Sequence, residues 1–373
     1  MTSRLGLLVN SPSKGTYANV VSRLAVGLAE TGRVETTLVC YGDDPAPPWL
    51  PSEIRIFRLG TTRASRSVPA LVSYLRSAQP DVLISRQVHG NLVGLAAAAL
   101  ARVRSGWRGK IVVAHDHPVE LAHASDWRDN KWLVRVGYPF ADGIIADSPT
   151  VRDDVIRWCR LDESSVVVVP IPIVPFSGEV DDVPHPWLRE GPPVFVTTAN
   201  LVAWKRIDLL LEAFHDLLAR HDARLLIIGE GPERRRLTEY IRTLGLTGRA
   251  ESLGWVSDPR EFAAAACALV LPSEEEGFAQ VLTEAMSVGC PVIAADALGG
   301  GPRYVTDNGH YGVLVPRGDR PALVQAMESM LQPDVRDRYS RLGLKRIEAF
   351  SPLSCADVLL DYLESLGVTN QKR

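Results

Sequence analysis

The chain has 373 residues, of which 46% are hydrophobic and 23% charged, and a formal net charge of -3 at pH 7. This length predicts two globular domains of about 180 residues each, and the composition excludes a fibre, a disordered chain and a disulfide-stapled miniprotein. A pI near 6.3 argues against a nucleic-acid-binding protein, because such proteins present a strongly basic face.

The first half of the chain alternates short apolar runs with helical patterns, which is typical of a parallel sheet wound with helices. Strands are expected at residues 5–10, 36–42, 81–86, 110–117, 143–148 and 166–172. Helices are expected at residues 17–32, 71–78, 92–103 and 150–159. Together these elements predict one doubly wound domain over residues 1–180.

A linker rich in Pro, Gly and acidic residues follows at residues 174–193. Beyond it, strands are expected at residues 193–199, 223–231, 250–256, 268–273, 291–296 and 312–316, and helices at 207–220, 232–244, around Phe262 and at 280–288. They predict a second domain over residues 181–350. The segment 351–373 contains a final helix that is expected to bridge back to the first domain.

The cysteines and the apolar segments indicate the cellular compartment of the protein. Five cysteines without a C-x-x-C pair indicate buried, reduced thiols, and they are Cys40, Cys159, Cys267, Cys290 and Cys355. The apolar stretch 5–9 is too short for a signal peptide or a membrane span. The alanine-rich segment 92–103 is also short and ends in arginines. A cytoplasmic protein is expected, resting at most on a membrane surface.

The segment from Arg55 to Lys110 is locally basic. It holds roughly ten Lys or Arg and a single acid, Asp81. Such a surface attracts phosphates or anionic lipid, although a solvated basic face explains the same pattern.

The loop SEEEGF at residues 273–278 links a predicted strand to the helix that begins near Gln280. Backbone amides at a helix N-terminus can hold a phosphate, and Gly277 allows close approach of the backbone. Glu276 and Glu284 flank this turn and can accept hydrogen bonds from sugar and ribose hydroxyls. The alternative is that Glu276 caps the helix and Glu284 is a surface residue.

Further candidates follow other strands. Lys205 can neutralise a departing diphosphate or be an ordinary solvated lysine. Gly229 and Gly231 in IIGEGPE indicate a tight turn beside a ligand, although a G-x-G without its third glycine is less specific. Gly15 in SPSKGT has the matching position in the first domain.

Two histidines end a predicted strand of the first domain. If the strand persists, His115 and His117 point to opposite sides and one of them faces the ligand-binding edge. A buried structural histidine is the alternative reading. No neighbouring Cys or carboxylate has ligand spacing, so no metal site is expected. Two such domains should face a central cleft at the carboxyl ends of their strands.

Several motifs together resemble glycosyltransferase family 4. PSEEEGFAQVLTEAMSVGCPVIAAD carries the Glu-x7-Glu pattern of that family at Glu276 and Glu284. TTANLVAWKRIDLLLEAF, LLIIGEGPERRRL and ADGIIADSPTVRDDV resemble further segments, so the resemblance covers almost the whole chain. It implies a GT-B fold of two Rossmann-like domains and a retaining, metal-independent, hexosyltransferase-type enzyme. The first domain would bind the acceptor and the second the nucleotide sugar. No cofactor is implied apart from the UDP- or GDP-linked cosubstrate.

The resemblance also assigns roles by matched position. Catalytic roles fall on Glu276, Lys205 and His115, and the acceptor side receives His89 and His117. The donor-binding positions are Gly15, Asn200, Lys205, Arg206, Gly229, Gly254, Trp255, Val256, Glu276, Gly277, Phe278, Ala279, Gln280 and Glu284. Among them, Lys205 would bind the diphosphate, Glu284 the ribose, residues 254–256 the base, and Glu276 with the 278–280 turn the sugar. The leaving phosphate itself would accept the proton of the acceptor.

The chain departs from the family pattern at a few positions. Asn200 replaces an arginine, and Arg206 stands where a glycine usually follows the lysine, so Arg206 is a candidate substitute cation. Tyr304 stands at the acid position of the later G-G-x-x-E segment. A catalytically weak sugar-nucleotide-binding protein is therefore an alternative to a transferase.

The acceptor is suggested by two more segments. VSYLRSAQPDVLISRQVHGN and GGPRYV…YGVLVPRGD resemble enzymes that build bacterial surface polysaccharides on lipid-linked diphosphate carriers. The expected partners are a nucleotide sugar, a glycan or polyprenyl-diphosphate-linked acceptor and, through the basic segment, an anionic membrane at the inner face of the cell membrane. A soluble acceptor such as an antibiotic aglycone, a cyclitol or a small sugar is the alternative.

Overall fold

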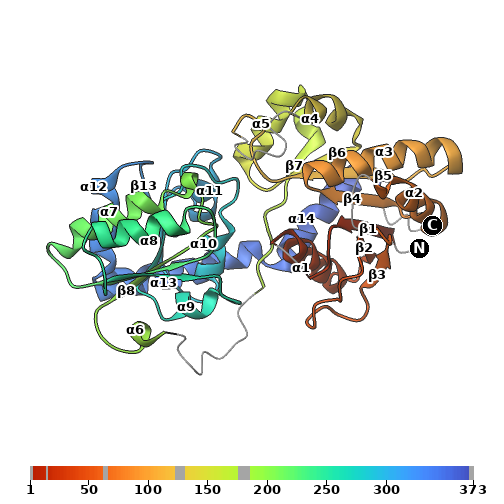
Figure 1. The fold of residues 1–373 in the computed structure, drawn as a ribbon. Helices are drawn as coiled ribbons and strands as arrows, with labels where there is room; N and C mark the ends of the chain where they lie inside the picture. Colours follow the sequence, from red (N-terminus) through yellow and green to blue (C-terminus); the bar gives the residue numbers. More distant parts are fainter. Residues whose placement is uncertain (1–2, 14–15, 62–65, 122–130, 175–184, 369–373) are drawn as a thin grey trace. The chain divides into compact units, whose positions relative to one another are not determined.

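The computed structural model describes residues 3–13, 16–61, 66–121, 131–174 and 185–368. The chain forms two compact units, Met1–Val174 with Ala349–Arg373, and Pro175–Glu348. Each unit is a twisted parallel sheet covered by helices, as Figure 1 shows.

The sheet of the first unit has seven strands in the order β3-β2-β1-β4-β5-β6-β7, and every pairing is parallel. Its strands are β1 (Ser3–Val9), β2 (Val34–Cys40), β3 (Arg55–Arg58), β4 (Val82–Arg86), β5 (Lys110–His115), β6 (Gly143–Ala146) and β7 (Val166–Val168). Its helices are α1 (Thr16–Glu30), α2 (Val68–Ala78), α3 (Val88–Ser105), α4 (Lys131–Gly137), α5 (Pro149–Cys159) and α14 (Pro352–Ser365), with short 3-10 turns η3 (Tyr138–Phe140) and η4 (Glu163–Ser165).

Alternate residues of each central strand supply two separate cores in the first unit. Leu7 packs into the core with α1 and α14, whereas Leu8 packs into the core with α2 and α3. Successive side chains of a strand point to opposite faces, so a strand that is buried on both faces must be apolar throughout. This requirement explains why the central strands read as continuous apolar runs.

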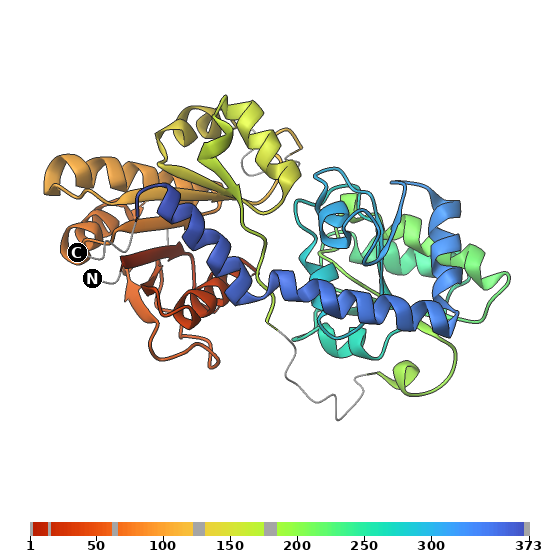
Figure 2. The ribbon, with the colours of Figure 1, turned by 180° about the vertical axis from the view of Figure 1, so that it is seen from behind.

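The helix α14 packs directly on α1, although more than 300 positions separate them. A Cβ atom on Gly27 of α1 would lie 2.0 Å from the carbonyl oxygen of Pro352, so the two backbones touch at this point. Tyr362 donates its hydroxyl hydrogen to the carbonyl of Ser165 at 2.6 Å and accepts from the amide of Ile144 at 3.1 Å. Figure 2 shows α14 beside α1.

The second unit has a six-stranded parallel sheet in the order β10-β9-β8-β11-β12-β13. Its strands are β8 (Val194–Thr198), β9 (Arg224–Ile228), β10 (Ala250–Gly254), β11 (Ala268–Leu271), β12 (Val292–Ala295) and β13 (Val313–Val315). Its helices are α6 (Pro186–Arg189), α7 (Ile207–Leu218), α8 (Arg234–Thr243), α9 (Arg260–Ala264), α10 (Gln280–Met286), α11 (Gly301–Thr306), α12 (Arg320–Met330) and α13 (Pro333–Ile347), with the 3-10 turn η5 (Ala203–Lys205). A further 3-10 turn, η6 (Glu348–Phe350), lies at the boundary between the two units.

The predicted α/β class with two doubly wound sheets is confirmed. The strand predicted at residues 110–117 ends earlier, at His115, so His117 lies outside it. The sequence prediction omitted β3, α4, the helices from α11 to α13, and α6, which lies inside the predicted linker. In β3, three of four residues are exposed or charged, and α13 buries only Gly343 and Ile347 within its bounds, so neither shows a clear apolar pattern.

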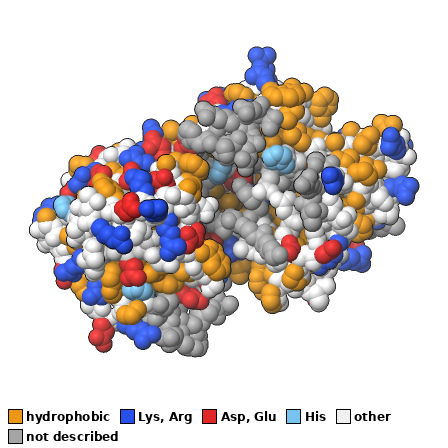
Figure 3. Space-filling model, viewed as in Figure 1, with side chains coloured by type: hydrophobic (Ala, Val, Ile, Leu, Met, Phe, Trp, Pro, Cys, Tyr) orange, Lys and Arg blue, Asp and Glu red, His pale blue; other side chains and the backbone are white. Residues whose placement is uncertain are grey.

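The five cysteines are free and buried, as predicted. Among the described residues, no helix is long and apolar enough to cross a membrane. Most large apolar side chains are buried, but Trp132, Val136 and Phe140 of α4 and η3 are exposed. Figure 3 shows hydrophobic side chains gathered over this part of the first unit.

Candidate functional site

The second sheet reverses its strand order between β8 and β11, which pair directly. In open parallel sheets, ligands bind outside the carboxyl ends of the strands at such a reversal. The loops that follow β8 and β11 carry Lys205 and Glu276, respectively. The two residues that the sequence singled out therefore come from the two loops that flank the reversal point.

Lys205 and Glu276 form an ion pair, with Nζ and Oε1 2.5 Å apart. The side chains are only 18% and 8% exposed, so their attraction is weakly screened by solvent. The amide of Glu274 donates to the carbonyl of Trp204 at 2.7 Å, and the amide of Glu276 donates to the carbonyl of Leu298 at 2.8 Å. These backbone bonds fix the two loops on which the pair depends.

Arg206, next to Lys205, is bound to other carboxylates. Its guanidinium lies 3.1 Å from Glu274 and 3.3 Å from Asp208, and these contacts outweigh burial and raise its pKa. Its φ of 50° is left-handed, a conformation that favours glycine. This backbone geometry explains why the family pattern has glycine here. Because of its two ion pairs, the Arg206 side chain would have to break its contacts with Glu274 and Asp208 to bind a diphosphate.

The turn between Glu276 and α10 is buried and tightly packed. Phe278 and Ala279 are almost fully buried, and Ala279 has a left-handed φ of 67°. A Cβ on Gly301 would lie 2.6 Å from the carbonyl carbon of Phe278, so only glycine fits beside this turn. On α10, the amide nitrogen of the Gln280 side chain donates to Oε1 of Glu284 at 2.6 Å.

The two glycines of IIGEGPE are required by a neighbouring loop. A Cβ on Gly229 would lie 1.9 Å from the carbonyl oxygen of Ala199, and one on Gly231 would lie 2.3 Å from that of Leu201. The loop after β8 therefore runs against the loop after β9. Asn200, which stands between Ala199 and Leu201 in this loop, is exposed to solvent.

The segment after β10 lies against the same loops. The amide of Gly229 donates to the carbonyl of Gly254 at 2.8 Å, and a Cβ on Gly254 would lie 2.7 Å from Oε1 of Glu230. Trp255 is 74% exposed and Val256 is partly buried. All predicted donor residues of the second unit thus lie at or beyond the carboxyl ends of β8 to β11, whereas Gly15 lies outside the described residues.

In the first unit, the structure buries His115 and exposes His117. His115 is 1% exposed, and its Nδ1 is hydrogen-bonded to the hydroxyl of Tyr138 at 3.0 Å. Asn91 donates to the same hydroxyl and to the carbonyl of Ala114, both at 2.8 Å. Burial lowers the pKa of His115 to about 4, so the ring is neutral near pH 7. His89, on the first turn of α3, is exposed like His117.

Sequence reasoning missed a polar pair where the first sheet reverses its order, between β1 and β4. Asn10, directly after β1, donates its side-chain amide to Oε1 of Gln87 at 2.7 Å. Gln87 has a φ of 67° and a ψ of 144°, which is a region used almost only by glycine. Strain of this kind persists where the surrounding structure enforces it, frequently at a ligand site. The residue type did not predict this conformation, because glutamine rarely adopts a positive φ.

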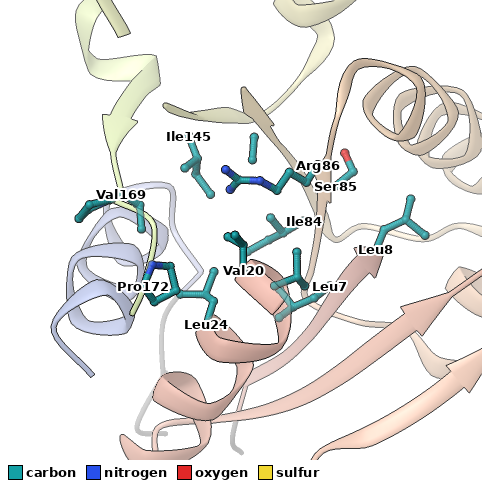
Figure 4. Close-up of a pocket in the computed structure, with 13 residues that line it drawn as sticks. Leu7, Leu8, Val20, Leu24, Ile84, Ser85, Arg86, Ile145, Val169 and Pro172 are labelled. Atoms are coloured by element: carbon teal, nitrogen blue, oxygen red, sulfur yellow. The ribbon is translucent and has the colours of Figure 1, made fainter. Parts of the chain in front are cut away.

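A buried ion pair lies beside Gln87. Arg86 is paired with Asp147, which is fully buried, and burial raises the pKa of Asp147 to about 6. Figure 4 shows the Arg86 guanidinium at the edge of an apolar pocket between the sheet and α1. The pocket is lined mainly by aliphatic side chains, including Leu7, Val20, Leu24, Ile84, Ile145 and Pro172. The signal for this pair was a charged residue at the end of each apolar strand, LISR and IIAD.

No group of three or more His, Cys, Asp or Glu side chains within the described ranges could hold a metal ion. What the geometry defines is a two-sheet α/β protein with a compact, partly buried cation–anion pair at the ligand-binding edge of its second sheet. That description fits a protein that binds a small anionic ligand with hydroxyl groups.

Comparisons with known proteins place it in a family. Residues 17–175 match the description "Glycosyltransferase Family 4", and residues 182–345 match "Glycosyl transferases group 1". The alpha-D-kanosaminyltransferase of Streptomyces kanamyceticus is 30% identical over 265 residues, which is 68% of each chain. A Campylobacter jejuni N-acetylgalactosamine-N,N'-diacetylbacillosaminyl-diphospho-undecaprenol 4-alpha-N-acetylgalactosaminyltransferase is 25% identical over 63% of each chain.

The fold agrees with a solved structure. HepE from Anabaena, determined with UDP and glucose, superposes with a TM-score of 0.75 at 18% identity, covering 97% of this chain and 100% of HepE. The chain belongs to glycosyltransferase family 4, and the predicted GT-B fold and enzyme class, a glycosyltransferase, are confirmed. The matched segments span only 18%, 63% and 50% of the first three curated relatives.

Proposed function

We propose that the protein transfers a sugar from a UDP- or GDP-linked donor to a hydroxyl of a glycan or lipid-linked acceptor in surface polysaccharide synthesis, with retention of configuration. The observation that carries this proposal is the ion pair of Lys205 and Glu276 at the strand-order reversal of the second sheet. The ammonium suits a diphosphate, and the carboxylate suits the hydroxyl hydrogens of a sugar.

The pair supports a simple division of labour during transfer. The bond from the anomeric carbon to the diphosphate breaks as the bond to the acceptor oxygen forms, and the acceptor proton passes to the leaving phosphate. Lys205 stabilises the negative charge that develops on that phosphate, in a site where it is little screened. Glu276 holds the sugar by its hydroxyls. Under this proposal, the 278–280 turn lies against the sugar.

Glu284 and residues 254–256 complete the proposed donor site on the second unit, which we assign to the donor. The carboxylate of Glu284 would exchange its hydrogen bond with Gln280 for the ribose hydroxyls. The first unit is assigned to the acceptor. A lipid-linked acceptor is supported by the diphospho-undecaprenol in the name of the Campylobacter relative, and a UDP donor by the ligand of HepE.

A thermal-shift screen with UDP, GDP, ADP and their sugars tests the donor. A ligand at 100 times its Kd stabilises the protein by about 2.7 kcal/mol, which raises the melting temperature measurably. We expect a shift with UDP or GDP that disappears in Lys205→Ala. A protein that shifts with none of these nucleotides contradicts the proposal. Transfer to a polyprenyl-diphosphate-linked sugar, compared with transfer to a soluble sugar in detergent-free buffer, then identifies the acceptor class.

A further inference from the structure

An unusual apolar stripe runs along α4 and η3. Trp132, Val136 and Phe140 are 58%, 56% and 72% exposed. They stand four residues apart on consecutive turns, so they lie on one side of this segment. The opposite side packs into the core through Val134 and Tyr138, which are fully buried. The segment therefore has large apolar side chains on its solvent side as well as on its core side, unlike an ordinary amphipathic helix.

The solvent side of α3 continues this apolar surface. A Cβ on Gly137 of α4 would lie 3.1 Å from Cδ2 of Leu92 on α3, and the two helices are in contact. The exposed positions of α3 include Ala96, Ala99, Leu100 and Val103. A helix that faces water normally carries polar residues there. We call these α3 positions with Trp132, Val136 and Phe140 the α3–α4 surface.

Exposed arginines surround the α3–α4 surface. Arg104, Arg108 and Arg135 are exposed, and no carboxylate of the described residues pairs with them. By contrast, Arg102 and Lys110 are both bound to Asp142. The segment from Lys131 to Phe140 contains no acid. In Figure 3, Lys and Arg side chains stand at the margins of the hydrophobic area over α3 and α4.

We propose that the α3–α4 surface docks onto a phospholipid bilayer that contains anionic lipids. Exposed Trp and Phe side chains partition into the interfacial layer of a membrane, and surrounding arginines bind anionic headgroups. A second copy of the chain is a poorer occupant, because a two-fold contact through this surface would bring the arginines of both copies together. The inference rests on the proposed function, since a lipid-linked acceptor is presented at such a bilayer.

The proposal also changes which residues of the basic segment carry membrane binding. The sequence alone assigned membrane binding to the whole basic stretch from Arg55 to Lys110. In the structure, Arg58 donates to the carbonyl of Asp44 at 2.7 Å, and Arg102 and Lys110 share the single carboxylate of Asp142. The contribution therefore comes mainly from the apolar stripe, with Arg104, Arg108 and Arg135 as its electrostatic rim.

Vesicle flotation of the full chain tests the proposal, with phosphatidylcholine vesicles and with mixed phosphatidylcholine–phosphatidylglycerol vesicles as probes. The double variant Trp132→Ala/Phe140→Ala should lower the partition coefficient at least about tenfold on both vesicle types. Its matched control is Trp49→Ala, because Trp49 is 46% exposed in the loop between β2 and β3, away from this surface. The control should bind like the wild type.

The rim is tested separately by Arg104→Glu/Arg108→Glu. Binding to the anionic vesicles should fall about fivefold or more, and added salt should weaken wild-type binding in the same way. Arg341→Glu, an exposed position on α13 of the second unit, is the control. Equal flotation of the wild type and the Trp132→Ala/Phe140→Ala variant would overturn the proposal. So would a concentration-dependent dimer, seen in sedimentation velocity, that the same variant dissociates.

Donor binding separates this inference from the proposed function. The thermal shift with UDP or GDP should be the same in the wild type and in Trp132→Ala/Phe140→Ala, because the variant leaves the second unit untouched. If nucleotide binding is present but flotation is absent, only the membrane inference fails. If flotation is present and no nucleotide binds, only the proposed transferase activity fails.

Discussion

The two sheets reverse their strand order in the same manner, but the side chains that meet there differ in charge. The second unit places an ammonium and a carboxylate together, Lys205 and Glu276, whereas the first unit places two neutral amides together, Asn10 and Gln87. An ammonium suits phosphate, while the side-chain amides of Asn10 and Gln87 offer donors and acceptors to hydroxyls. The difference supports a donor site on one unit and an acceptor site on the other.

The largest expected effect comes from removing one member of the charged pair. Lys205→Ala should lower kcat for sugar transfer about 10²- to 10³-fold, because the charge that develops on the leaving phosphate loses its stabilising ammonium. Initial rates with a saturating donor measure this loss.

A double variant separates this catalytic role from a structural one. Lys205→Met/Glu276→Gln removes both charges together, so it leaves no uncompensated buried charge and should melt close to the wild type. Its activity should stay as low as that of Lys205→Ala. Recovery of transfer in the double variant would show that the pair only maintains the fold.

The neutral pair should matter less. Gln87→Gly removes the amide and relieves the positive φ, so the KM for acceptor should rise about tenfold while the free energy of unfolding rises by about 1 kcal/mol. Steady-state kinetics and chemical denaturation measure the two effects. Gln87→Ala is the matched variant, since it loses the same amide but keeps the strain. An unchanged KM for acceptor in both variants would show that the acceptor does not bind at the strand-order reversal of the first sheet.

A smaller effect should follow from adding a cation to the proposed donor site of the second unit. Asn200→Arg places an arginine where the family pattern has one, and it should tighten UDP or GDP binding about threefold to fivefold at low salt. Isothermal titration calorimetry measures the change. Gln332→Arg, on an exposed position of the same unit, should leave the affinity as it is. If both variants tighten binding equally, the gain is a general charge effect.

The pH dependence of stability should be small in the wild type, because two buried groups of the first unit oppose each other. The pKa of His115 falls from 6.5 to about 4, so this group makes the folded state more stable as the pH rises across that window. The pKa of Asp147 rises from 3.8 to about 6, so this group makes the folded state less stable over nearly the same window.

Chemical denaturation between pH 4 and pH 6.5 can separate these contributions. In His115→Gln, the histidine no longer offsets the Asp147 contribution, so the free energy of unfolding should fall with rising pH relative to the wild type. Asp147→Asn should show the opposite relative slope. Parallel pH profiles for the wild type and His115→Gln would mean that the histidine does not titrate in the manner its burial implies.

The strands and the charged pair were predictable for different reasons. Strands buried on both faces must be apolar along their whole length, so β1, β4 and β5 were visible in the sequence. Lys205 and Glu276 were candidates because each follows a predicted strand, but their ion pair was not predicted, since 71 positions separate them. Neither spacing nor residue type alone would have joined them.

Other features depend on tertiary contacts that no local pattern encodes. Sequence alone could not decide between a buried and an accessible His115, because the answer depends on Tyr138, 23 positions away. Gln87 adopts a backbone conformation that its residue type disfavours. The need for glycine at positions 229 and 231 comes from the carbonyls of Ala199 and Leu201, whereas the sequence suggested a ligand.

The return of α14 to α1 also affects how the chain folds during synthesis. Residues of α14, including Cys355, Leu359 and Leu363, complete one of the two cores of the first unit. A ribosome therefore releases the whole second unit before the first can finish folding, although domains made earlier usually fold earlier. Until residue 365 has left the exit tunnel, α1 presents a bare apolar face, so the first unit is the part of the nascent chain that most needs a chaperone.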